Sequence, residues 1–304
     1  MTQRKITRTL LFVSTVLGAA APVQADPVQE AQIRATEVAP GIHMLEGQGG
    51  NIGLLSGDQG ALLIDDQYAP LTGAILKAVS EITDQPVQFV LNTHWHGDHT
   101  GGNENLGRRG AVIVAHENVR KRLSSEQFME AFNRTAPAAP EVARPVITFT
   151  RDLTFHWNGE EVRVFHVGHA HTDGDALIHF KRANVFHLGD TFFNGFYPFI
   201  DAGSGGVIDG MIEAADLVLE QADESTKIIP GHGPLGNRAA LQDYRDMLVT
   251  VRARIDGLLE EGLSRDEIIA RKPTEDLDAK WGGGFMKPDV WVGLLVDGIE
   301  RNRK

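Results

Sequence analysis

The stretch Thr93-His94-Trp95-His96-Gly97-Asp98-His99-Thr100-Gly101-Gly102 places four potential metal ligands within six residues. It follows an apolar run at 87–91 that predicts a buried strand, so these polar side chains are expected on a loop at the strand's C-terminal end. Imidazole and carboxylate groups together suit zinc or a similar divalent metal. The alternative, four polar residues on a solvated turn, explains the cluster poorly, because each would need a polar partner if it were buried.

Three later segments supply ligand-type residues of the same kinds, each directly after a predicted strand. They are Gly168-His169-Ala170-His171-Thr172, Gly189-Asp190-Thr191 and Gly231-His232-Gly233. Functional groups commonly lie at the C-terminal ends of strands, where a rigid sheet holds the loops that carry them. Four such strand ends therefore indicate a metal site on one rim of a sheet sandwich.

Strand-like and helix-like segments alternate in two successive halves. In the first half, Pro70 is expected to open a helix and the charged stretch 117–132 to form another. A proline-containing stretch at 135–145 is expected to be a loop or a crossover between the halves. The second half begins with a hairpin signal at Asn158-Gly159, and apolar residues repeat every three or four positions along a long helix over 241–258.

The C-terminal tail is expected to be helical and to pack on the body of the protein. Ser264 and Glu267 form a capping box, and Pro288 lies near the start of a last helix. Trp281 and Trp291 are expected to dock this tail, with contact to a substrate as the less favoured alternative.

The chain contains the motif His-x-His-x-Asp-His and then, in this order, a further His, Asp and His. This pattern resembles that of the metallo-β-lactamase superfamily, and the resemblance extends from about residue 42 to residue 232. The resemblance implies an α/β fold, the αβ/βα four-layer sandwich, in which two mixed sheets lie between helices. By matching position it also implies a seven-ligand, two-zinc centre. One zinc would be bound by His94, His96 and His171, the second by Asp98, His99 and His232, and both by Asp190.

Single residues around this centre carry more detailed expectations. His171 is preferred over His169 as the ligand because the threonine after it and the following strand fit the superfamily spacing. A zinc with an open position can hold a water that ionises near neutral pH, and Asp98 is expected to ligate the metal and to orient this nucleophile. Asp65 ends a strand and could accept a proton from a ligand imidazole. His116 is the other histidine most open to a role at the site.

At several positions this sequence differs from particular subclasses of the superfamily, and these differences limit the activities that are expected. Asp190 stands where true β-lactamases with a thiolate ligand have cysteine, which resembles glyoxalase II and lactonases instead. His96 stands where the flavo-diiron relatives have glutamate. No lysine or arginine lies between Asp190 and Lys227 to anchor a substrate carboxylate. The aromatic residues there are expected to form an apolar pocket wall, with Tyr197 as a polar handle, or to pack the sandwich.

The N-terminus predicts export. Residues 1–25 combine a basic start, an apolar stretch and the small-residue site Val23-Gln24-Ala25, which is typical of a cleaved signal peptide rather than of an uncleaved anchor. Residues 26–304 are then expected to form one domain in the periplasm or outside the cell, with no integral membrane anchor. The chain has no cysteine, so neither a disulfide framework nor a thiolate ligand can form.

The formal net charge of −12 argues against nucleic acid as a partner, because phosphates require basic patches.

Together, the motifs predict a zinc-dependent hydrolase with a small-molecule substrate, in which a metal-bound hydroxide attacks a lactam, lactone, ester or thioester. A β-lactam is the leading substrate, and iron or manganese is the alternative metal for the second site. The alternative functions are a glyoxalase II-like thioesterase and a non-catalytic periplasmic metal-binding accessory protein. No sequence feature indicates the oligomeric state.

Overall fold

A seven-stranded mixed sheet is built by the first half of the chain. The computed structural model describes residues 32–303, so the signal peptide predicted over 1–25 lies outside the described residues. The strands, in the order in which they lie side by side, are β1 (Arg34–Ala39), β2 (Ile42–Glu46), β3 (Ile52–Leu55), β4 (Ala61–Ile64), β5 (Val87–Leu91), β6 (Val112–His116) and β9 (Ile147–Phe149). The first four strands pair antiparallel, and pairing from β4 to β9 is parallel.

The second half forms a six-stranded sheet whose strands follow chain order. These are β10 (Asp152–Trp157), β11 (Glu160–His166), β12 (Ala176–Phe180), β13 (Val185–His187), β14 (Lys227–Ile229) and β15 (Gly236–Asn237). Only β13 and β14 pair parallel. The turn between β10 and β11 is the predicted hairpin turn, with Asn158 and Gly159 at φ 50° and 77°. Two successive positive φ values are what a type I′ turn requires.

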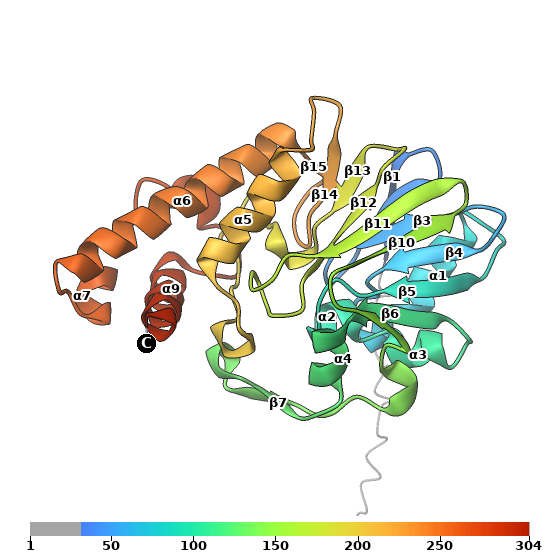
Figure 1. Cartoon of the computed structure of the whole chain (residues 1–304), viewed down its shortest axis with the longest axis horizontal. Coiled ribbons are helices and arrows are strands. Elements are labelled where there is room, and N and C mark those ends of the chain that lie inside the picture. The colour runs from blue at the N-terminus through green and yellow to red at the C-terminus, as the bar shows by residue number, and fades with distance from the viewer. Residues whose placement is uncertain (1–31, 304) are drawn as a thin grey trace, which may run out of the picture. The chain divides into compact units, whose positions relative to one another are not determined.

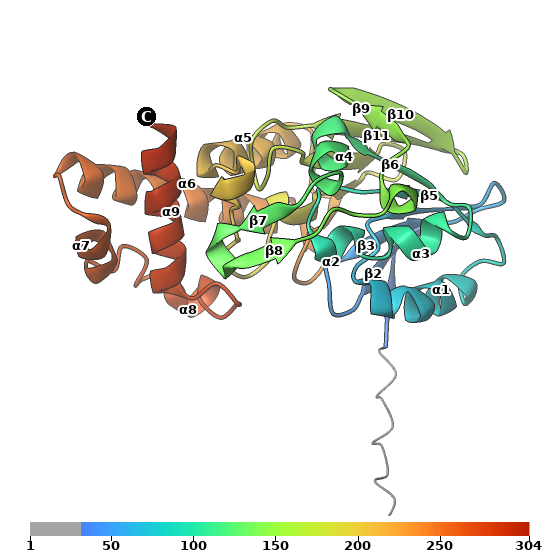
Figure 2. The same ribbon diagram turned by 90° about the horizontal axis from the view of Figure 1, so that it is seen from below.

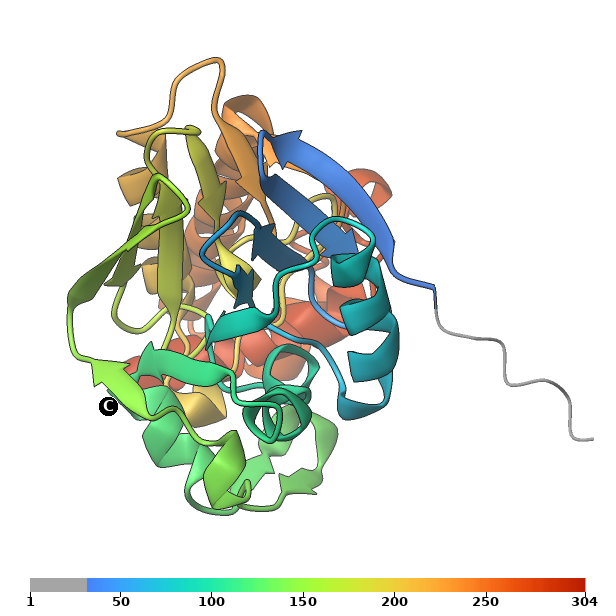
Figure 3. The ribbon, with the colours of Figure 1, turned by 90° about the vertical axis from the view of Figure 1, so that its right-hand side faces the viewer.

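Helices lie outside the two sheets, at their rim and in the C-terminal tail. They are α1 (Thr72–Ser80), α2 (Gly97–Thr100), α3 (Asn103–Gly107), α4 (Glu117–Leu123), α5 (Ile208–Leu219), α6 (Arg238–Glu260), α7 (Arg265–Ala270), α8 (Asp278–Trp281) and α9 (Pro288–Asn302). Figure 1 shows α5 and α6 on the second sheet, and Figure 3 shows the two sheets side by side with α1 outside the first.

The hydrophobic core divides along the same layers. Side chains such as Met44 and Ile64 from the first sheet meet Val164 and Ile178 from the second, all almost fully buried. A separate cluster joins α1 to the first sheet, and the largest joins α5, α6 and the tail to the second. Alternate residues of each strand therefore face either the other sheet or a helix, which confirms the predicted αβ/βα sandwich.

The predicted helix over 117–132 is wrong in its second half. Helix α4 ends at Leu123, where the Ser124 hydroxyl donates to the Arg120 carbonyl. Serine side chains compete with the helix for such backbone groups, and two serines follow one another here. The chain then forms a small hairpin of β7 (Gln127–Met129), a 3-10 turn η2 (Glu130–Phe132) and β8 (Arg134–Ala136), so the loop predicted over 135–145 begins inside a strand.

The C-terminal tail packs as expected. Trp281 and Trp291 are buried in the core cluster of the second sheet, and the capping box of Ser264 and Glu267 is present at the start of α7. Pro288 occupies the first turn of α9, where its missing N–H costs nothing. Within residues 32–303, no helix combines the length and the apolar character that crossing a membrane requires.

Candidate metal centre

All seven predicted ligands lie at strand ends on one rim of the sandwich. His94, His96, Asp98 and His99 follow β5, and the short helix α2 carries the last two. His171 follows β11, Asp190 lies in the 3-10 turn η4 (Gly189–Thr191) after β13, and His232 follows β14. The structure brings these seven side chains, from four loops, into two adjoining groups.

The first group contains three histidines and Asp190. One ligand atom from each of His94, His96, His171 and Asp190 lies within 4.8 Å of the others, and all four residues are buried. His171 Nε2 lies 2.9 Å from His96 Nδ1. Three imidazoles and a carboxylate form a donor set that zinc commonly takes.

The second group contains Asp98, His99 and His232. His232 Nε2 lies 3.2 Å from Asp98 Oδ2, and His99 Nε2 lies 3.6 Å from the same oxygen. The side chains of Asp98 and His232 are 22% and 23% exposed, whereas those of the other five residues are at most 5% exposed. A substrate can therefore reach the centre from the side of Asp98 and His232.

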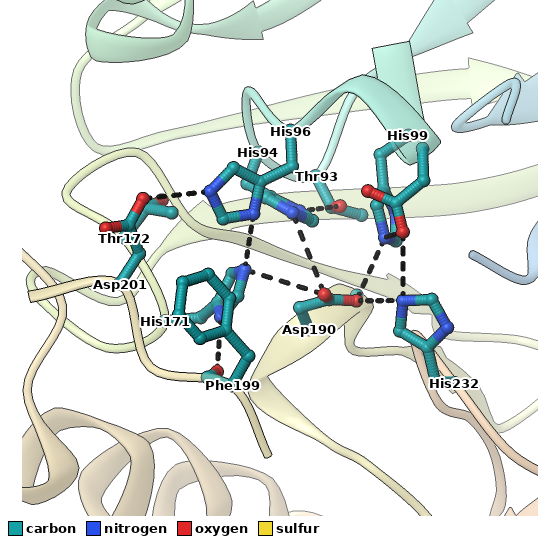
Figure 4. A network of polar contacts seen from close by, with 12 residues as sticks. Thr93, His94, His96, His99, His171, Thr172, Asp190, Phe199, Asp201 and His232 are labelled. Atoms are coloured by element: carbon teal, nitrogen blue, oxygen red, sulfur yellow. Dashed lines mark hydrogen bonds and ion pairs between the residues drawn. The ribbon is translucent and has the colours of Figure 1, made fainter. Parts of the chain in front are cut away.

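Asp190 lies between the two groups (Figure 4). Its Oδ2 lies 3.5 Å from His171 Nε2 and 3.9 Å from His94 Nε2. Its Oδ1 lies 3.0 Å from His99 Nε2 and 3.4 Å from His232 Nε2. One carboxylate thus presents one oxygen to each group, which is the arrangement of a bridging ligand.

The outer nitrogens of the first three imidazoles are held by other groups. His171 Nδ1 donates to the Phe199 carbonyl over 2.8 Å, and His96 Nε2 donates to Asp201 Oδ2 over 3.0 Å. The Thr93 hydroxyl donates to Asp65, so its oxygen accepts from His94 Nδ1 over 3.0 Å. These partners set the tautomer of each ring and leave its inner nitrogen unprotonated.

Asp65 is the corresponding partner for the second group. Its Oδ2 accepts from His99 Nδ1 over 2.8 Å and from the Thr93 hydroxyl over 2.7 Å, and its Oδ1 accepts from the Thr93 amide over 2.7 Å. Asp65 is fully buried and has φ 65°. The structure therefore shows the contact that the sequence suggested for this residue.

The inner atoms of the cluster fit a pair of divalent cations. His94 Nε2, His99 Nε2 and Asp190 Oδ1 are buried without a hydrogen bond, since the 3.0 Å approach of the last two atoms lacks hydrogen-bond geometry. His96 Nδ1 and His171 Nε2 face each other although neither carries a proton in the tautomers described above. Facing lone pairs repel, and a cation between them removes the repulsion. The donor set and these orphaned atoms therefore suit divalent metals.

The charges of the groups agree with this assignment. Burial lowers the pKa of His94 far below its usual value and that of His171 to about 4, so both rings are the neutral ligands that a metal needs. Burial alone would also lower the pKa of His232, but Asp190 and Asp98 raise it to about 9. Burial also opposes protonation of His99, but Asp190, Asp98 and Asp65 raise its pKa well above the usual value, so without a metal protonated histidines of the second group balance the two carboxylates.

Two glycines leave room for the second group. A Cβ on Gly50 would lie 2.1 Å from His99 Cε1, and a Cβ on Gly231 would lie 2.1 Å from Asp190 Oδ1. Neither ligand could keep its position beside a larger residue. The glycines next to the ligands thus have a steric role at the centre.

Other histidines and aspartates near the motif have structural roles. His169 is exposed and pairs with the Gly205 carbonyl, which supports the choice of His171. His116 lies outside the cluster, because its ring accepts from the Asn118 amide at the start of α4 and stacks on His166 at 3.8 Å. Asp175 caps the His171 loop by accepting from the amides of His171 and Thr172.

The aromatic residues that follow Asp190 mainly pack against the ligand histidines and do not form the wall of an open pocket. Phe199 stacks on His96 with ring centroids 5.8 Å apart, and Phe193 stacks on His232 at 5.3 Å. The prediction of Tyr197 as a polar handle is wrong. Its ring stacks on Trp291, and its hydroxyl donates to Asp278 over 2.9 Å.

Asp201 is the partner of a ligand that the sequence did not reveal. It follows Ile200 in an ordinary-looking loop, 105 residues from His96. It is buried, and its Oδ1 accepts from the Ser204 amide, so the carboxylate is fixed from both sides. Burial raises its pKa, but the hydrogen bond and charge of His96, together with Ser204 and His171, outweigh this effect and lower the pKa to about 2.

We expect Asp201→Asn to weaken metal binding by about ten- to a hundredfold, which is typical for loss of a carboxylate that orients a ligand histidine. Competition with a chromophoric chelator would measure the affinity. Asp209→Asn is the matched control, because Asp209 pairs with Arg252 away from the metal centre and its side chain is 59% exposed. Equal affinity in the wild type and Asp201→Asn would show that His96 needs no such partner.

A four-layer sandwich with a His/Asp metal cluster on its strand-end rim defines a class of metal-dependent hydrolases. Comparison with known proteins agrees: the Metallo-beta-lactamase superfamily model matches residues 45–235, and the chain belongs to this superfamily. It is 33% identical over 258 residues to the Beta-lactamase-like protein 2 homolog of Caenorhabditis elegans, covering 78% of this chain and 85% of that protein.

Two more distant relatives show how broad the superfamily is. The chain is 24% identical over 186 residues to the Hydroxyacylglutathione hydrolase of Pelagibacter ubique (strain HTCC1062), covering 58% of this chain and 66% of that protein. The crystal structure of the DIM-1 metallo-beta-lactamase matches with a TM-score of 0.58 at 19% identity, covering 73% of this chain and 99% of that one. At this identity the structural likeness shows the fold alone.

Proposed function

We propose that this metallo-hydrolase is exported and uses two zinc ions to cleave a carbonyl-type bond in a lactam, lactone, ester or thioester. The observation that carries the proposal is Asp190, which presents one oxygen to the three-histidine group and the other to the Asp98 group. Zinc, when bound, supplies a Lewis acid and lowers the pKa of a coordinated water towards neutrality. The His/Asp donor set without a thiolate leaves iron or manganese as the alternative in the second group.

The protein's own residues would position the reactants. Asp98 combines an accessible side chain with a place beside His232, so its carboxylate can accept a hydrogen bond from the attacking water and orient it. Burial raises the pKa of Asp98, but His99 and His232 together outweigh this effect and lower the pKa to about 2, which keeps the carboxylate ionised and able to accept hydrogen bonds. The buried rings of Phe193 and Phe199 exclude water from behind the ligands.

The nature of the carbonyl compound is the finer part of the proposal. The bridging carboxylate and the Hydroxyacylglutathione hydrolase relative favour a thioester or another open-chain acyl group. Predicted export and the metallo-beta-lactamase relatives favour a β-lactam. The second candidate function, a non-catalytic metal-binding accessory protein, would keep the same cluster without turnover.

We expect the purified zinc-loaded protein to hydrolyse at least one member of a panel of chromogenic β-lactams, acyl-lactones and acyl thioesters. A chelator should abolish this turnover, and zinc should restore it, because the nucleophile depends on the metal. Metal analysis of the same sample gives the number of ions bound. Fully loaded protein without chelator-sensitive turnover on the panel would favour the accessory protein.

A further inference from the structure

The hairpin of β7, η2 and β8, residues 127–136, lies over the rim that carries the metal centre. We call it the rim hairpin. Strand β7 contacts the 3-10 turn η5 (Ala202–Ser204), directly after the His96 partner Asp201. Figures 1 and 2 show the hairpin at the same edge of the sandwich as α2, reaching towards α5 and α9.

Three contacts hold the rim hairpin in place. Met129 packs against both the core of the second sheet and the small cluster around Trp95. Glu130 forms an ion pair with Arg301 of α9 at 2.7 Å. The ring of Phe132 lies 4.8 Å from that of Phe199, which itself contacts His96 and His171. The tip of the hairpin is therefore one aromatic ring away from the first ligand group.

The pairing of the two strands defines an inner and an outer face. Met129 pairs with Arg134, and Phe128 pairs with Thr135. Residues directly opposite each other lie on the same face of a sheet, and neighbours along a strand lie on opposite faces. Because Met129 packs inwards, Arg134 lies on the inner face as well, whereas Phe128, which is 57% exposed, lies on the outer face.

Arg134 is an exposed cation on this inner face of the rim hairpin. Its side chain makes no ion pair or side-chain hydrogen bond with any residue in the described part of the chain. Burial raises the pKa of the Tyr68 hydroxyl, and the charges of Asp98, His99, Arg134 and Asp190 act on it as well. Tyr68 itself is 44% exposed and lies against the end of α2, since a Cβ on Gly101 would be 2.9 Å from Tyr68 Cα.

Exposed aromatic rings border the centre on its other sides. Phe285, in the tail before α9, is 53% exposed and lies 6.3 Å from Phe193, which stacks on His232. Phe132 is 44% exposed beside the first ligand group, and Tyr68 is exposed beside the second. Exposed aromatic rings around a polar centre are suited to binding an apolar ligand, because the ligand covers apolar surface that otherwise contacts water.

We propose that the rim hairpin is a substrate-recognition element, in which Arg134 binds a carboxylate of the substrate while Phe132 and Phe285 contact an apolar part. This inference rests on the proposed hydrolase function and names its substrate class, an amphiphilic carbonyl compound with a carboxylate. Arg134 supplies the cation that the segment between Asp190 and Lys227 lacks. An arginine fork pairs with a carboxylate through two parallel hydrogen bonds, and the Tyr68 hydroxyl can donate a third.

Two esters that differ only in one terminal group test the role of Arg134. The 4-nitrophenyl monoester of glutaric acid carries a carboxylate where 4-nitrophenyl valerate carries a methyl group. We expect the wild type to prefer the glutarate ester in kcat/KM, and Arg134→Gln to reduce the preference about tenfold, as for a partly exposed charge-assisted hydrogen bond. Arg134→Lys should retain part of the preference, because it keeps the charge but not the fork.

The hairpin itself provides the matched control. Phe128→Ala removes an aromatic side chain of the same hairpin on its outer face and should leave both esters unaffected. Phe132→Ala should lower kcat/KM for 4-nitrophenyl octanoate about fivefold relative to the acetate, because it removes apolar contact near the centre. An unchanged ester preference in Arg134→Gln, together with normal chelator-sensitive turnover, would overturn the inference and leave the proposed function standing.

A binding experiment separates the inference from turnover. Calorimetry on chelator-treated protein would compare 4-phenylbutyrate with the neutral 4-phenylbutan-1-ol, in the wild type and in Arg134→Gln. We expect the acid to bind about tenfold more weakly to the variant and the alcohol to bind both proteins equally. If the acid binds more weakly to Arg134→Gln but no ester is hydrolysed, the role of the rim hairpin in recognition would be supported and the proposed hydrolase function would be contradicted. Equal binding of the acid to both proteins would overturn the role of Arg134.

Discussion

If the centre binds two metal ions as proposed, Asp190→Ala should leave the protein with one and reduce kcat about a thousandfold on any substrate that the wild type turns over. The carboxylate oxygens lie 3.5 Å from His171 Nε2 and 3.0 Å from His99 Nε2, so the truncation removes a donor from both groups. The first group keeps three imidazoles, whereas the second keeps two imidazoles and the partly exposed Asp98. We therefore expect the second ion to be lost preferentially.

Metal analysis by mass spectrometry after gel filtration would give the stoichiometry, and this readout does not depend on knowing the substrate. Asp190→Asn keeps the shape of the side chain and removes its charge, so it should also lose the second ion while disturbing the fold less. Asp209→Ala removes an exposed carboxylate and should retain both ions. Two ions in Asp190→Ala would exclude Asp190 as a bridge.

The ligands could be predicted because a local sequence pattern identifies each of them. His94, His171 and His232 each follow an apolar strand, and small residues flank His171 and His232, while His94 stands two residues from His96, so the sequence marks each loop without any knowledge of distant contacts. The sandwich then brings the loops together, because the strands that precede them end on the same rim. The same reasoning predicted the two halves, the Asn158-Gly159 turn and the long helix α6.

The residues that support the ligands could not be predicted in this way. Asp201 has no local pattern, and its role depends on a contact with His96 across 105 residues. Tyr197 looked like a pocket residue because it follows Asp190 closely, but its partner Asp278 is 81 residues away. Such contacts depend on how the tail folds back, which the periodicity of a single segment does not contain.

The rim hairpin was not predicted because its strands are short. Its strands have three residues each, too few for the alternation of apolar and polar residues to be recognised. Charged residues at 117–126 favour a helix, and nothing in that stretch except Ser124 and Ser125 indicates where it ends. Arg134 falls between the helix predicted over 117–132 and the loop predicted over 135–145, so no predicted element drew attention to it, although the structure places it in strand β8 of the rim hairpin.

Asp65→Ala should destabilise the metal-free protein by at least about 3 kcal/mol, since each buried donor left without an acceptor costs about 1–3 kcal/mol. Three donors lose their acceptor at once: the Thr93 amide, the Thr93 hydroxyl and His99 Nδ1. Alanine also tolerates φ 65° less well than aspartate, which adds to the cost. For a chain of this size the melting temperature should fall by about 6–12 °C.

Thermal unfolding in the presence of a chelator measures this effect on the hydrogen bonds alone, without the contribution of bound metal. Asp65→Asn keeps a side chain that accepts φ 65° and one acceptor oxygen, so its melting temperature should lie between those of the wild type and Asp65→Ala. Asp152→Ala, at a 58% exposed side chain, should change stability by less than about 0.5 kcal/mol. If Asp65→Ala melted like the wild type, the three donors would have to find other acceptors, and His99 and the Thr93 loop would not depend on this carboxylate for their positions. If it melted early yet bound two zinc ions as tightly as the wild type, Asp65 would stabilise the fold without orienting His99.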